Sequence, residues 1–294
     1  MNRIVECVAN FSEGRRLDVV QQIVGVIGAV EGVKVLAYES DADHNRSVIT
    51  FAGDPDAMLQ ATFEGIRVAS ELIDLNSHQG QHPRLGAADV VPFIPIRQVT
   101  MDDCIRMAHQ LGKRVGDELN IPVYLYEQAA TRPDRKNLAD VRRGEYEGLQ
   151  QSIASDPNRK PDYGKAEVGT AGAMIIGARH ALIAYNVFLT TDNVEVAKNI
   201  AKVIRHSSGG LRYVKALGLL VDGKAQVSMN LTNYKKTPIY RVVEMIRREA
   251  ERYGVGIESS ELIGLIPQDA LLESAAWYLQ MDNYNSDRVL ENRL

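Results

Sequence analysis

Two histidines stand four residues apart, at His78 and His82, in the stretch HQGQHPRLGAADVVPFIPI. Pro83 and Arg84 follow the second histidine directly. Because a residue before proline is pushed away from helical geometry, we expect His82 on an extended or turn backbone at the end of an element. A titratable imidazole held on a rigid loop beside a fixed positive charge suits a general base near neutral pH.

Three interpretations of His82 compete at this point. It could be a turn residue satisfied by a backbone carbonyl, since matches to short motifs carry false positives. It could be a metal ligand with His78, because His-x-x-x-His binds zinc when both imidazoles share a helix face. Gly80 and Pro83 argue against a helix there, and no cysteine lies nearby. The third interpretation, a general base, needs support from elsewhere in the chain.

That support is a resemblance that covers nearly the whole chain. The blocks that carry it are VECVANFSEG at 5–14, NRSVITFAGDP at 45–55, HPRLGAADVVPFIP at 82–95, PVYLYEQAA at 122–130, RRGEYEGL at 142–149, PDYG…TAGA…GAR…LIAYNV at 161–187, QVSMNLTNY at 226–234 and LIGLIPQDALL at 262–272. Each block is long and unusual in composition. Together they resemble the glutamate formiminotransferase family.

The resemblance implies an enzyme of histidine degradation. Family members move the formimino group of N-formimino-L-glutamate to N5 of tetrahydrofolate, giving 5-formimidoyltetrahydrofolate and glutamate. N5 must lose a proton as it attacks the amidine carbon, so a base is required. His82 occupies the position of the family's catalytic histidine. Two alternatives stay open: formyl transfer or cyclo-ligase chemistry on 5-formyltetrahydrofolate, and a folate-binding protein without catalysis.

Further site residues follow from the chemistry and the resemblance. Both substrates carry carboxylates, for which the guanidinium forks of Arg84 and Arg46 are suited. The positive amidine would favour a carboxylate nearby, and Glu39 stands where animal members have an aspartate. Asn10 follows the first expected strand, where loops often supply site residues.

The segment GKAEVGTAG is expected to line the folate site, as the matching segment does in the family. Its glycines let backbone amides approach a flat ring closely. This chain lacks the tryptophan that animal members have here and is one residue shorter. The residues concerned are Gly164, Lys165, Ala166, Glu167, Val168, Gly169, Thr170, Ala171 and Gly172.

Composition and net charge argue against some classes of binding partner. The 294 residues carry a net charge of −4, so no global basic field favours nucleic acid or an anionic membrane. No apolar run approaches the roughly 20 residues that span a bilayer. Cys7 and Cys104 fall at expected core positions and are predicted to be buried thiols, which suits a cytoplasmic protein. Neither a metal nor a nucleotide is required by any feature of the sequence.

The elements alternate in an order that repeats. The first half is expected to contain strands at 4–9, 33–39, 46–52, 90–96 and 122–126, with helices at 17–29, after Asp54-Pro55 and from 100–103. The second half is expected to contain strands at 181–189, 214–221, 226–231 and from 255–257 towards 262, with helices from 192 and from 237–238. The order β-α-β-β-α-β is that of the ferredoxin-like split motif. We therefore predict an α+β protein with two such subdomains around a substrate cleft.

The polar region 131–166 is interpreted as the boundary between the subdomains, which we place at 1–178 and 179–294. Its basic residues are explained either by a solvated linker or by a surface that steers a multiply anionic ligand, such as a polyglutamate tail. The resemblance also implies a homodimer and a separate protein for the cyclodeaminase step.

Overall fold

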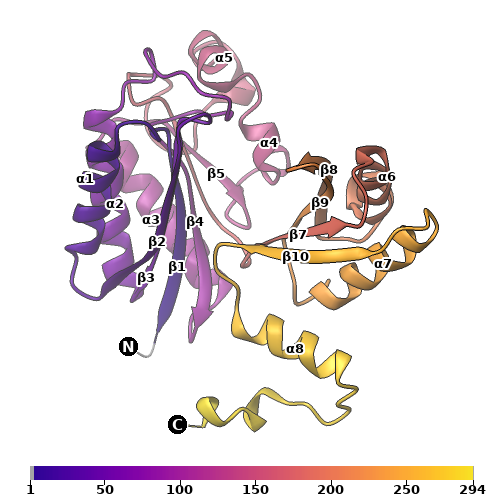
Figure 1. Cartoon of the computed structure of the whole chain (residues 1–294). Coiled ribbons are helices and arrows are strands. Elements are labelled where there is room, and N and C mark those ends of the chain that lie inside the picture. The colour runs from indigo at the N-terminus through magenta and orange to yellow at the C-terminus, as the bar shows by residue number, and fades with distance from the viewer. Residues whose placement is uncertain (1–2, 294) are drawn as a thin grey trace. The chain divides into compact units, whose positions relative to one another are not determined.

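The computed structural model describes residues 3–293, which fall into two compact units that divide along the chain between Arg179 and His180. The strands of the first unit are β1 (Ile4–Phe11), β2 (Val33–Asp41), β3 (Arg46–Gly53), β4 (Ala88–Arg97), β5 (Val123–Glu127) and β6 (Met174–Ala178). Its helices are α1 (Leu17–Gly28), α2 (Pro55–Leu72), α3 (Met101–Glu118), α4 (Leu138–Val141) and α5 (Glu145–Ser152) (Figure 1).

The sheet of the first unit has the order β2-β3-β1-β4-β6-β5. The first four strands pair antiparallel and contain β-α-β-β-α-β in the ferredoxin-like arrangement. β6 then joins β4 and β5 in parallel and widens the sheet. The predicted split motif is confirmed here, with two strands added.

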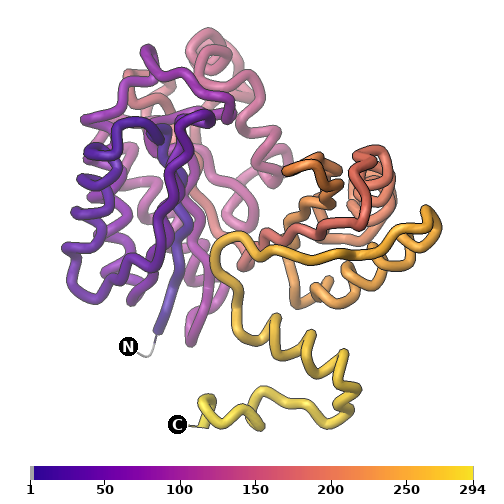
Figure 2. Tube along the Cα trace, in the orientation of Figure 1, coloured from indigo at the N-terminus to yellow at the C-terminus, as the bar shows by residue number. Residues whose placement is uncertain are grey.

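The second unit is a smaller sheet of the same kind. Its elements are β7 (Ile183–Leu189), α6 (Val194–Ile204), β8 (Val214–Val221), β9 (Lys224–Leu231), α7 (Ile239–Glu251), β10 (Ile257–Ile263) and α8 (Gln268–Tyr278). The sheet order β10-β7-β9-β8 is again ferredoxin-like. After β10 the chain continues into α8 and short 3₁₀ turns (Figure 2). The predicted α+β fold class is confirmed.

Side chains pack on both faces of the first sheet. Along β4, Val91 and Phe93 belong to the core that α1, α2 and α3 cover, whereas Val90 belongs to a second cluster. Successive residues of a strand point to opposite faces. The second cluster, which includes Val141 of α4 and Leu149 of α5, therefore covers the other face at the β4-β6-β5 end.

Three sequence-based interpretations need correction. Residues 131–166 are not the boundary between the units, because the chain returns afterwards as β6, between β4 and β5. The apolar run Met174–Ala178 was not foreseen as a strand, because one short run alone does not reveal its partner. The last strand runs over Ile257–Ile263 rather than starting at Val255.

Local signals behaved as expected elsewhere. Asp54 accepts a hydrogen bond from the Asp56 backbone at the start of α2, and Thr100 forms a full capping box with Asp103. The two cysteines are buried and free, as predicted. Burial raises the pKa of Cys7 and raises that of Cys104 to about 12.

A close backbone crossing fixes the loop that precedes β4. Gly86 bridges Gly172, and the Ala173 amide donates to the Leu85 carbonyl at 2.9 Å. Gly172 has φ +73°, and a Cβ there would lie 2.2 Å from the Leu85 oxygen. Only glycine suits both the left-handed backbone and the contact.

Gly172→Ala should lower the free energy of unfolding by at least about 1–2 kcal/mol, the cost of a left-handed alanine, before the clash is added. Gly169→Ala is the matched control, since a Cβ at Gly169 would meet no atom within 4 Å. Urea unfolding of the two variants measures the difference. Equal stability of both would contradict the importance of the crossing.

Candidate active site

His78 anchors the loop between α2 and β4 that carries His82. The His78 side chain is buried, and its Nε2 lies 2.9 Å from the Asn45 carbonyl oxygen. Its Nδ1 accepts a hydrogen bond of 3.2 Å from Nε of Arg84. A neutral imidazole that accepts at Nδ1 must carry its proton on Nε2, which then donates to Asn45. Both ring nitrogens are therefore used to hold the loop.

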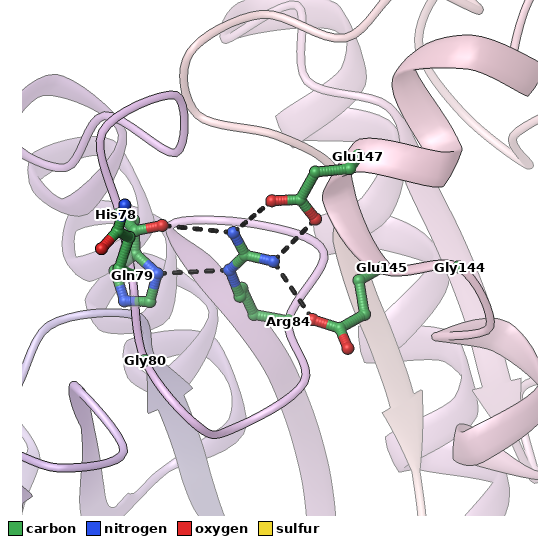
Figure 3. A pocket seen from close by; sticks show the side chains of 7 residues that line it. All are labelled: His78, Gln79, Gly80, Arg84, Gly144, Glu145 and Glu147. Carbon is green, nitrogen blue, oxygen red and sulfur yellow. Dashed lines mark hydrogen bonds and ion pairs between the residues drawn. The ribbon is translucent and has the colours of Figure 1, made fainter.

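Arg84 joins this loop to the start of α5. Its Nη1 donates to Glu145 at 3.1 Å and to Glu147 at 2.9 Å, while Nη2 donates to Glu147 at 2.6 Å and to the His78 carbonyl at 3.2 Å. The bond from Nε to His78 accounts for the remaining N–H of the guanidinium. Figure 3 shows the guanidinium between His78 and the two glutamates.

A pocket of about 450 Å³ opens beside this cluster, lined by His78, Gln79, Gly80, Arg84, Gly144, Glu145 and Glu147 (Figure 3). The glutamates are the exposed partners, with 44% and 60% of their side chains accessible against 9% for Arg84. A substrate carboxylate would reach Arg84 by replacing one of them. In this structure all the hydrogen bonds of Arg84 go to other groups of the protein.

His82 lies in a neighbouring crevice with Asn10, Arg46 and Asp89. The imidazole is half-buried, and the His44 ring approaches it edge-on at 6.4 Å between centroids. Burial, followed by the positive charges of Arg46 and Arg142, lowers the pKa of His82 to about 4. At neutral pH the ring is therefore unprotonated, as a proton acceptor must be.

Asn10 and Arg46 form a pair at the ends of β1 and β3. The Asn10 side-chain oxygen accepts from Nε of Arg46 at 2.7 Å and also from its Nη2. Burial lowers the pKa of Arg46, and repulsion by Arg142 lowers it further. The sequence grouped Asn10 and Arg46 as substrate contacts; the structure brings them together with His82 in one crevice.

Glu39 lies on the exposed edge strand β2. The register pairs it with Val48, which in turn pairs with Asn10, so all three side chains share one face of the sheet. Two strand spacings place the Glu39 backbone about 10 Å from that of Asn10. Glu39 therefore lies on the sheet face that carries the Asn10–Arg46 pair, but two strands away from Asn10.

The segment 164–172 is tied to the His82 loop through its backbone. The Thr170 and Ala171 carbonyls accept from the amides of Leu75 and Ala87, at 2.8 and 2.9 Å. The Gly169 carbonyl accepts from the Tyr146 hydroxyl at 3.3 Å. The side chains of Lys165 and Glu167 are exposed, as are Gly164, Gly169 and Thr170, whereas Ala166, Val168 and Ala171 pack partly against the core.

The sequence reasoning missed Asp89 and Arg142 as site residues. Asp89 is 2% exposed; its Oδ1 accepts from the Leu85 amide at 2.8 Å and its Oδ2 is paired with Arg142. Burial raises the pKa of Asp89, and the Arg142 guanidinium opposes that rise. The single charged residue in the apolar run AADVV could have indicated a buried ion pair, because aspartates are rarely buried unless they are paired. Arg142 lies in the basic region 131–166, for which the sequence left open either a solvated linker or a surface that steers anions.

Two kinds of feature are absent from residues 3–293. No cluster of three or more His, Cys, Asp or Glu side chains is arranged to hold a metal ion. No helix within that range combines the length and apolar character needed to cross a membrane.

Comparison with known proteins identifies the family. Residues 4–179 match the family described as "Formiminotransferase domain, N-terminal subdomain", and residues 184–292 match "Formiminotransferase domain". The chain belongs to the formiminotransferase family. The match covers both compact units, so the resemblance read from the sequence blocks is confirmed.

Similar full-length proteins occur in an archaeon and a bacterium. The chain is 52% identical to a glutamate formimidoyltransferase of Thermoplasma acidophilum, over 99% of this chain and 97% of that one. It is 46% identical to a glutamate formimidoyltransferase of Streptococcus pyogenes serotype M1, over 100% and 99% of the two chains. A formimidoyltransferase-cyclodeaminase of Dictyostelium discoideum is 40% identical over 100% of this chain and 56% of its own.

His82 should make part of the stability depend on pH. Its pKa is about 4 in the folded chain and near 6.5 when unfolded. Between these values the unfolded chain binds more protons, so stability rises with pH and is lost as pH falls through the window. Across this pH window we expect His82 to contribute about 1–2 kcal/mol to the free energy of unfolding. This is less than the full pKa shift implies, because water screens the charge of a half-exposed ring.

The measurement is urea unfolding of wild type and His82→Asn at pH 7 and pH 4.5. The wild type should lose more stability than the variant on acidification. Parallel losses would mean that His82 titrates as it does in the unfolded chain.

Proposed function

We propose that this protein is a glutamate formimidoyltransferase that moves the formimino group of N-formimino-L-glutamate to N5 of tetrahydrofolate. The observation that carries the proposal is identity of 52% and 46%, over nearly full length, to two proteins of that name. The crevice around His82 supplies what the reaction needs: an unprotonated base beside positive charges that suit carboxylate substrates.

We assign His82 the proton transfers. Its imidazole takes the N5 proton of tetrahydrofolate as N5 bonds to the amidine carbon, giving a tetrahedral intermediate. The protonated ring then returns that proton to the glutamate nitrogen as the bond from carbon to this nitrogen breaks. A substrate carboxylate near Arg46 and Arg142 would raise the pKa of His82 from its value of about 4, and so strengthen the base when substrate is present.

The other assigned residues support this step. We propose that Arg46, held by Asn10, binds a carboxylate near His82, and that residues 164–172 contribute to the tetrahydrofolate site. Arg84, whose N–H groups all have protein partners, keeps the His82 loop in place. Glu39 shares the sheet face with Asn10 and is a candidate partner for the positive amidine.

The cellular setting is proposed from the family. Since the Thermoplasma and Streptococcus relatives match this chain over nearly their whole length, we propose that a separate protein performs the cyclodeaminase step. We further propose a cytoplasmic location, consistent with two free buried cysteines, and a homodimer, as the family resemblance implies.

His82→Ala should lower kcat for transfer to tetrahydrofolate by about 10²- to 10⁴-fold, the usual contribution of a general base. Tetrahydrofolate affinity, measured by fluorescence titration, should stay within a few-fold, because the loop is anchored by His78 rather than by His82. N-formylglutamate and 5-formyltetrahydrofolate, the latter with and without ATP, serve as comparison substrates. Turnover of 5-formyltetrahydrofolate without formimino transfer would refute the proposed reaction.

A further inference from the structure

Arg142 leaves one strong hydrogen-bond donor unused beside His82. It caps the end of α4, and its side chain is 12% exposed. Nη2 is paired with Asp89, but Nε is buried and has no hydrogen-bond partner among residues 3–293. A buried donor without a partner is destabilising, and more so on a charged group. Such a donor calls for an explanation, and a missing ligand is one.

The charges around His82 are not balanced. The titratable and charged groups that line the crevice with His82 are Arg46 from β3, His44 from the loop before β3, Asp89 from β4, and His78 and Arg84 from its own loop. Arg142, at the end of α4, is paired with Asp89, and its charge also lowers the pKa of His82. Arg84 is matched by two glutamates. Arg46 and Arg142 repel one another and are both attracted by the buried carboxylate of Asp89, and Arg46 is also attracted by the exposed Asp41. Among the more buried groups, two guanidiniums therefore meet one carboxylate, which leaves a surplus of positive charge there.

We propose that Arg142 is a substrate-binding and positioning residue, whose free Nε and surplus charge receive a carboxylate of the glutamyl substrate next to His82. The inference rests on the proposed function and goes beyond it by naming the carboxylate partner. An Nε–H and a neighbouring Nη–H form the side of the guanidinium fork that carboxylates bind. Asp89 is bound at Nη2, on the same side of the guanidinium as Nε, and fixes its orientation, so that the substrate carboxylate would bind Nε beside Asp89.

The neighbouring Arg143 provides the matched control. Its side chain is 77% exposed and is paired with Asp140 rather than with Asp89. Arg142→Gln could leave Asp89 buried and unpaired, so the double variant Asp89→Asn, Arg142→Gln is included. An asparagine at position 89 can still accept the bond from the Leu85 amide. Arg142→Lys keeps the charge and removes the fork.

The experiment measures L-glutamate binding by calorimetry, together with KM for each substrate. Arg142→Gln, Arg142→Lys and the double variant should weaken glutamate binding and raise KM for N-formimino-L-glutamate by roughly 10- to 100-fold. KM for tetrahydrofolate should change by less than about 2-fold, a difference near 0.4 kcal/mol. Arg143→Gln should behave as wild type, and melting curves confirm that each variant is folded.

A second readout separates this role from a purely structural one. In an NMR titration of His82, Arg142→Gln should move the imidazole titration to higher pH, whereas Asp89→Asn should move it to lower pH. Shifts of the same sign in both variants would indicate general disruption and overturn the proposal.

The possible failures can be told apart. An active wild type whose folded Arg142 variants bind L-glutamate normally would overturn the role of Arg142 alone. Equal losses of L-glutamate binding in Arg142→Gln and Arg143→Gln would also overturn the role of Arg142. A wild type that neither transfers the formimino group nor binds L-glutamate would overturn the proposed function, and with it this substrate for Arg142.

Discussion

The saturated guanidinium of Arg84 is the interaction on which the geometry of the site depends. One side chain joins His78, Glu145 and Glu147, and so ties the loop before β4 to the start of α5. His78 extends this network to the Asn45 backbone. The loop that carries His82 is thereby tied to two other segments of the chain, which helps to position a base so that it acts at one atom.

Charge is distributed unevenly across this network. On one side Arg84 meets two glutamates, and on the other Arg46 and Arg142 share Asp89. His82 lies on the positive side, where burial and both arginines keep its ring unprotonated. Under the proposed function, the same positive field would attract anionic substrates, whose binding would in turn make the ring more basic. The arrangement would then couple substrate binding to activation of the base.

The extra strands of the first unit explain how Arg142 reaches the site. A plain ferredoxin-like sheet would end at β4, but β6 and β5 widen it, and α4 and α5 cover the added surface. The end of α4 therefore lies above the start of β4, where Asp89 is buried. The backbone bridge between Gly86 and Gly172 also holds the segment that precedes β4.

The sequence by itself determined the two β-α-β-β-α-β orders, the main helix caps and the family, and it predicted His82 as the base. These depend on local spacing, on capping residues such as Thr100, and on long matching blocks. Only the tertiary structure decided that Arg84 binds glutamates 61 and 63 residues away, and that Arg142 pairs with the buried Asp89. Charge pairing depends on the distance between two groups in space. The number of residues between them in the sequence does not reveal that distance.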